Sequence, residues 1–194
     1  MAVAHRQLPL VAERGDPSPV GGVALGRGFV YVAGAWTDLH AVAAPGLAAP
    51  AKKEPGRPPS IGPAVQTKDP RFEVYRTEGQ VHAVAVRGEV ALVAAGSAGL
   101  HAVSLDRPMK RIAALPTEGF AYDVAISGDT VWVAECGAGL SLWKLESDGV
   151  PVLLARYRVS GEASKQIVIA PGGRYAMLHG GRSQFQVVSL AGNE

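Results

Sequence analysis

The sequence has little cysteine, few aromatic residues and no long apolar run, and each shortage narrows what the chain can be. One cysteine, Cys136, stands among 194 residues, which excludes an internal disulfide and a zinc site made of several cysteines. No stretch is apolar over the ~20 residues that a membrane-spanning helix needs, and residues 1–10 lack the apolar segment of a signal peptide. We therefore expect no membrane span and a cytoplasmic chain as written, or an extracytoplasmic one if it is a mature or excised fragment.

Strong charge of one sign is also missing. The formal net charge is +2 and no segment is densely basic, so the chain lacks the electrostatic signature of a nucleic-acid-binding protein. Glycine and proline are abundant instead, at 24 and 14 residues, while aromatic residues make up 6%. This mixture favours many short strands joined by tight turns.

The common catalytic and cofactor motifs are absent as well. The sequence contains no Gly-x-Ser-x-Gly elbow, no phosphate-binding loop, no dinucleotide-binding glycine motif and no Asp-x-Asp-x-Asp-Gly calcium loop. His40 and His101 occupy equivalent Leu-His-Ala-Val segments, which indicates a repeated structural environment more than a pair of metal ligands. We predict no catalytic residue, no metal site and no cofactor.

What the sequence does contain is an internal repeat. Residues 77–79 and 117–119 both read Thr-Glu-Gly, and residues 98–100 and 138–140 both read Ala-Gly-Leu. Between and after these tripeptides, short segments of alternating apolar and polar residues are separated by glycine turns. Four such segments in about 40 residues predict an antiparallel meander of four strands.

Two weaker copies flank the clear pair. The equivalent apolar positions are Val23, Val84, Val124 and Ile167, and the long first interval is explained by a proline-rich inserted loop at residues 44–69, for which we expect no regular structure. The repeats predict an all-β fold, a β-propeller of four-stranded antiparallel blades at residues 20–77, 78–116, 117–159 and 160–190, the last completed by a strand at residues 7–14.

How such a ring closes stays open at this stage. The four blades could form a single small ring, half of an eight-bladed dimer, or a segment of a larger propeller. A strand at residues 7–14 that completes the last sheet would close a ring and hide an exposed edge. Within the blades, Trp132 and Trp143 are expected to pack between neighbouring sheets.

The Gly-Leu steps carry a family resemblance. Residues 91–94 with 99–108, and residues 131–134 with 139–146, resemble the LVIVD repeat of bacterial and archaeal β-propellers. The family pattern is a strand ending in Val-Ala, a Gly-Leu turn, an apolar strand, then an Asp and a nearby Pro. Asp106 fits the acidic position and Glu146 replaces Asp there, whereas the first and last copies lack both features. The resemblance implies a propeller fold and says little about function.

The candidate binding residues lie on the loops that share one face of such a propeller, where scaffolds commonly present their contacts. Trp36 is a possible surface anchor in its loop, and the other candidates are charged or titratable. The set is Trp36, Asp38, Glu78, Glu118, Glu135, Glu162, His179 and Arg182.

Three functions remain open at this stage. The first is a non-enzymatic binding scaffold for a protein partner or a small ligand. The second is a metal- or carboxylate-dependent enzyme at the channel mouth, and the third is an architectural half-propeller completed as a homodimer.

Overall fold

The structure is a computed structural model, and it describes residues 20–34, 38–43, 72–159, 164–170, 175–180 and 185–189. All regular structure in these ranges is β-strand. The described residues form no helix with the length and apolarity needed to cross a bilayer.

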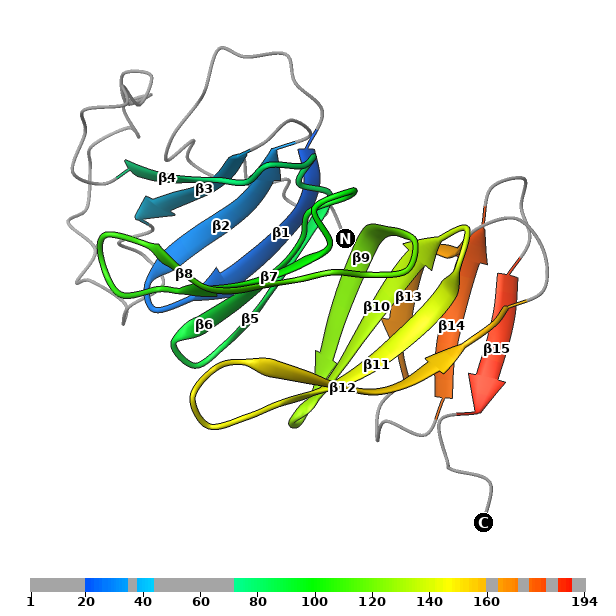
Figure 1. The fold of residues 1–194 in the computed structure, drawn as a ribbon. Helices are drawn as coiled ribbons and strands as arrows, with labels where there is room; N and C mark the ends of the chain where they lie inside the picture. The colour runs from blue at the N-terminus through cyan, green and yellow to red at the C-terminus, as the bar shows by residue number, and fades with distance from the viewer. Residues whose placement is uncertain are drawn as a thin grey trace, which may run out of the picture.

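The strands form four antiparallel sheets, each following the order of the sequence (Figure 1). The first three sheets have four strands each and the last has three described strands. Sheet 1 contains β1 (Val20–Gly26), β2 (Phe29–Gly34), β3 (Asp38–Ala43) and β4 (Phe72–Arg76). Sheet 2 contains β5 (Ala83–Arg87), β6 (Val90–Ala94), β7 (Leu100–Ser104) and β8 (Lys110–Leu115). Sheet 3 contains β9 (Phe120–Ser127), β10 (Thr130–Cys136), β11 (Gly139–Leu145) and β12 (Pro151–Tyr157), and sheet 4 contains β13 (Ser164–Ile169), β14 (Tyr175–Gly180) and β15 (Phe185–Ser189).

This architecture confirms the predicted antiparallel propeller blades. The hairpins that join the first two strands of sheets 1, 2 and 3 turn within two residues, which requires a left-handed backbone at the first turn residue. Gly88 and Gly128 take this conformation with φ of 56° and 60°, and Arg27 takes it with φ of 51°. The predicted strand at residues 7–14 and the inserted loop at residues 44–69 lie outside the described residues.

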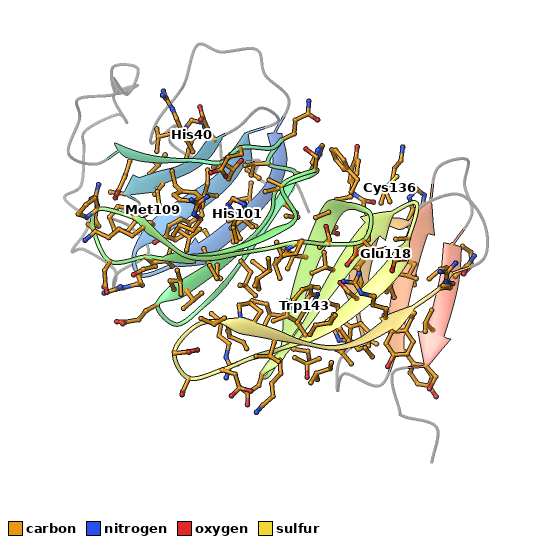
Figure 2. The ribbon with its side chains drawn as sticks, viewed as in Figure 1. His40, His101, Met109, Glu118, Cys136 and Trp143 are labelled. Atoms are coloured by element: carbon orange, nitrogen blue, oxygen red, sulfur yellow. The ribbon has the colours of Figure 1, made fainter. Side chains whose placement is uncertain are left out.

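Successive sheets pack face to face around their innermost strands. Strand β1 lies beside β5, β5 beside β9, and β9 beside β13, so one strand from each sheet faces the common axis. Apolar side chains fill the three spaces between sheets as three separate clusters. Trp143 and Trp132 are buried in the second and third clusters, as expected from the sequence, and Figure 2 shows Trp143 within its sheet. Burial of this repeated interface is the main stabilising force of the array.

Ion pairs add a link at the hairpin end of the sheets. Arg27 lies 3.5 Å from Glu89 in the next sheet, and Arg87 pairs with Asp129 in the sheet after that. These pairs are exposed and contribute little to stability, but they repeat the same sheet-to-sheet relation.

The row of sheets has two ends. Sheet 1 and sheet 4 lie at opposite ends of the row in Figure 1. In the described part of the chain, no strand of sheet 1 packs along a strand of sheet 4 in the way that β1 packs along β5. The described array is therefore open between its first and last sheets.

Candidate binding face

Two sets of loops meet at one end of the sheets: those that lead from an outer strand to the next innermost strand, and those that join second and third strands. Gly96, in the loop between β6 and β7, exchanges two backbone hydrogen bonds of 3.0 Å with Ala121 at the start of β9. Backbone pairing thus joins loops of two different sheets. We call this end of the array the mouth face, and define it by residues 77–82, 95–99, 116–122 and 136–138 with the charged side chains that reach them.

Close packing fixes the paired Thr-Glu-Gly turns on this face. A Cβ on Gly79 would lie 2.1 Å from the carbonyl oxygen of Ala95, and one on Gly119 would lie 2.6 Å from that of Cys136. Only glycine permits this approach. The hydroxyls of Thr77 and Thr117 each donate to the carbonyl oxygen two residues later, at 2.5 and 2.7 Å, so the repeated sequence produces a repeated turn.

A buried carboxylate holds the second of these turns. Glu135, near the end of β10, is almost completely buried, and its Oε2 accepts hydrogen bonds from the backbone N–H groups of Glu118 and Gly119 at 2.8 and 3.0 Å. The guanidinium of Arg156 lies 3.4 Å from the same oxygen and 3.6 Å from Oε2 of Glu118. Glu135 therefore acts as a bracket between the strand and the loop, while Glu118 remains at the surface (Figure 2).

An equivalent charged group lies on the preceding turn. The Glu78 carboxylate pairs with Arg111 at 2.6 Å, and this guanidinium lowers the pKa of Glu78. Behind it, the buried His101 ring lies between the first two sheets (Figure 2), with its Nδ1 3.0 Å from the hydroxyl of Tyr75 and its Nε2 3.8 Å from Glu78. Burial lowers the pKa of His101 more than the nearby carboxylate raises it.

A row of equivalent side chains faces the axis at the same end. His82, Tyr122 and Lys165 each stand two residues before the repeated apolar position of their sheets. The His82 ring stacks on Tyr122 with centroids 4.3 Å apart, and Nζ of Lys165 lies 5.7 Å from the Tyr122 centroid, a distance at which a cation is attracted to the ring. Burial lowers the pKa of His82, and its Nε2 is a buried atom without a hydrogen-bond partner in the described structure.

Asp123 ties this row to the next sheet. Its Oδ2 accepts a 2.9 Å hydrogen bond from the backbone N–H of Ile167, across the β9–β13 boundary. Its pKa is raised because burial outweighs the two backbone hydrogen bonds that stabilise the carboxylate.

The structure brings only some of the predicted residues together. Glu118 and Glu135 meet through Arg156, and Glu78 lies on the equivalent turn of the previous sheet. Asp38 pairs with Arg76 at 3.5 Å, and His179 is exposed on the outer side of sheet 4. Trp36, Glu162 and Arg182 lie outside the described residues. His40 is buried like His101, as their equivalent sequence positions indicated.

The row of His82, Tyr122 and Lys165 along the axis was not predicted from the sequence, nor was the burial of Glu135. The repeat spacing could have predicted this row, because His82, Tyr122 and Lys165 each stand two residues before the repeated apolar position. No group of three or more His, Cys, Asp or Glu side chains that could hold a metal ion occurs among the residues that the structure describes.

The buried histidines make stability depend on pH. Since burial lowers the folded-state pKa of His82 and His101, the unfolded chain binds more protons below pH ~6.5 and the free energy of unfolding falls as the pH drops. Denaturant titrations should show the free energy of unfolding decreasing from pH 7.5 to pH 5.5, by up to about 1.4 kcal/mol per pH unit for each histidine. The His101→Gln variant should show a shallower decrease, and an unchanged slope in that variant would contradict the assignment.

No family model matches the sequence, and no curated protein matches it. Solved structures do match the fold. The computationally designed Ika4 protein has a TM-score of 0.66 at 10% identity, over 95% of this chain and 99% of that one. The β-propeller domain of Cps50 (Swd1) from Myceliophteria thermophila has a TM-score of 0.65 at 9% identity, over 90% of this chain and 52% of that one.

A Bacteroides uniformis protein provisionally named a 6-phosphogluconolactonase has a TM-score of 0.67 at 13% identity, over 93% of this chain and 54% of that one. The chain thus spans about half the length of these last two proteins and nearly all of Ika4. At these identities the likeness concerns the fold alone. The chain is an array of four β-propeller blades, and hydrogen bonds hold several of its loops in place at one end of the sheets.

Proposed function

We propose that this chain is a non-enzymatic binding scaffold that presents its mouth face to a protein partner. The observation that carries the proposal is the Glu135 bracket, in which a buried carboxylate holds the backbone of a surface turn. A loop fixed before binding loses less conformational entropy when a partner docks. The bracket and the Gly96–Ala121 backbone pair supply this rigidity in neighbouring sheets.

The chemistry of the face fits a protein surface of mixed charge. Glu78 and Glu118 are exposed, and each has an arginine beside it. Arg158 is almost fully exposed and lies 3.9 Å from Glu118. Charges of both signs on fixed loops give specificity and faster association through electrostatic complementarity. Lys165 and Tyr122 extend this set toward the axis with a cation and a half-buried aromatic ring.

The resemblance of the two middle blades to LVIVD repeats supports a scaffold of this type. We propose membership of that family on the Gly-Leu steps at residues 99–100 and 139–140. Both glycines have positive φ and lie where a Cβ would meet the carbonyl oxygen of the outer strand, at 2.3 Å in each case. Close packing against the outer strand therefore explains why glycine occupies the first position of each Gly-Leu step.

Charge reversal tests the proposal. The Glu78→Lys, Glu118→Lys double variant should lose at least about 10-fold of the partner bound by the wild-type chain, because it replaces attraction by repulsion on the face. Partners are captured on a tagged chain by mild cross-linking in cells and quantified by mass spectrometry.

The matched control is Glu89→Lys with Asp129→Lys, which makes the same charge change at the opposite end of the sheets on comparably exposed side chains. The proposal requires that this control keep the partner. Equal capture by both double variants, loss in the control alone, or no partner specific to the wild type would overturn it.

A further inference from the structure

The two end sheets carry the two halves of the interface that joins the sheets inside the chain. Each internal interface has a receiving side, contributed by the earlier sheet, and a docking side, contributed by the later one. Strand pairing makes Tyr31, Leu92, Trp132 and Met177 equivalent on the receiving side. Strand pairing also makes equivalent Leu39, Leu100, Leu140 and Phe185 on the receiving side. On the docking side the equivalent residues are Val23, Val84, Val124 and Ile167.

Exposure separates the last sheet from the others on the receiving side. Leu39, Leu100 and Leu140 are 0–2% exposed, whereas Phe185 is 66% exposed. Tyr31, Leu92 and Trp132 are 0–3% exposed, whereas Met177 is 49% exposed. Val168, Tyr175 and Val187 extend this uncovered apolar side of sheet 4. Sheet 4 therefore presents a receiving side that is filled in every earlier sheet.

The first sheet shows the converse on the docking side. Val84, Val124 and Ile167 are 6–7% exposed, whereas Val23 is 58% exposed and its neighbour on the same side, Leu25, is 59% exposed. Exposed apolar patches of this kind mark interaction sites in soluble proteins. Sheet 1 thus presents an uncovered docking side.

The uncovered receiving side of sheet 4 and the uncovered docking side of sheet 1 are complementary, because the equivalent residues of the other sheets pack against each other at every internal interface. Leu39 and Val84 lie in one core cluster, Leu100 and Val124 in the next, and Leu140 and Ile167 in the third. Within one chain the open sides lie at opposite ends of the row (Figure 1). The two open sides do not meet within the described residues, so no described sheet of the same chain fills either of them.

We propose that a second copy of this chain is the occupant, and that two copies close head to tail into one ring of eight blades. Sheet 4 of each copy receives sheet 1 of the other, which makes two identical interfaces related by a two-fold axis and leaves no open side. The chain superposes on 52% of a longer β-propeller domain, so propeller arrays with more blades than these four exist. This inference concerns the assembly and is independent of the proposed binding of a partner at the mouth face.

Mass measurement in solution tests the proposal on the full chain and on single variants. Light scattering after size exclusion should give twice the chain mass for the wild type. Leu25→Glu alone and Phe185→Lys alone should each be monomeric and still unfold cooperatively, since both side chains are exposed in the free chain. An unpaired charge buried in each interface should weaken association at least about 100-fold.

Mixing the two variants is a more specific test than measuring each variant alone. An equimolar mixture of the Leu25→Glu and Phe185→Lys chains should recover the dimer, because one interface in the mixed pair is wild type and the other contains both opposite charges. Leu154→Lys, at an exposed apolar position on β12 outside both sides, is the matched control and should remain dimeric. A monomeric wild type, an assembly other than a dimer, or a mixture that stays monomeric would overturn the proposal.

Discussion

Aspartate at position 124 is expected to destabilise the chain strongly, whereas aspartate at the equivalent position 23 should leave its stability almost unchanged. Val124 is buried between sheets 2 and 3 in an apolar cluster. A carboxylate there has no partner, and a buried charge without a partner costs about 3–5 kcal/mol. Since domains of this size are stable by only about 5–15 kcal/mol, Val124→Asp should remove a large part of the free energy of unfolding.

Val23 makes the comparison informative because it has the same residue type, the same strand position and an exposed side chain. Denaturation of the two variants, at a chain concentration low enough for single copies, should show a change below about 0.5 kcal/mol for Val23→Asp, as is usual for surface sites. Equal losses at the two positions would mean that sheet 1 is covered like the others, and the open-row description would be wrong.

Removing the Glu135 carboxylate is the second large expected effect. Glu135→Ala leaves the N–H groups of Glu118 and Gly119 without their acceptor and should lower the free energy of unfolding by about 2–4 kcal/mol. Glu135→Gln keeps one oxygen that can accept both hydrogen bonds and should cost less than Glu135→Ala, although its NH2 group takes the place of Oε1, a buried atom without a hydrogen-bond partner among the described residues. Denaturant titration gives the stability, and amide hydrogen exchange at residues 118 and 119 reports the turn directly.

Glu118→Ala is the control for this prediction. It removes an exposed carboxylate from the same cluster and breaks only surface ion pairs, which contribute about 0–1 kcal/mol. If Glu135→Ala exchanged amide hydrogens at the wild-type rate at both positions, Glu135 would not hold the turn.

Much of the fold follows from repeat spacing. The equivalence of Val23, Val84, Val124 and Ile167 was predicted from the sequence, and strand pairing confirms it. Alternation within each strand and the glycine turns determine the antiparallel meander, because both are local properties. The buried tryptophans followed from the same alternation.

The candidate site was less predictable because it depends on how sheets stack. In the sequence, Glu135 comes after the apolar run at residues 131–134 and shortly before Gly137, which predicts a surface loop, yet the neighbouring turn covers its side chain. The stacking of His82 on Tyr122 and the Asp123 hydrogen bond to Ile167 also cross between sheets. The open ends depend on the rotation from each sheet to the next, a quantity that no residue pattern in one blade specifies.

The open row with complementary ends is tested most directly by a cross-link between positions 23 and 185. Their equivalents share one core cluster at each internal interface, so cysteines placed there should lie close wherever the two sides meet. Val23→Cys and Phe185→Cys are combined in a Cys136→Ser chain and treated with a short bifunctional maleimide. A covalent dimer bridged between chains is expected, and a monomer bridged within one chain would contradict the open row.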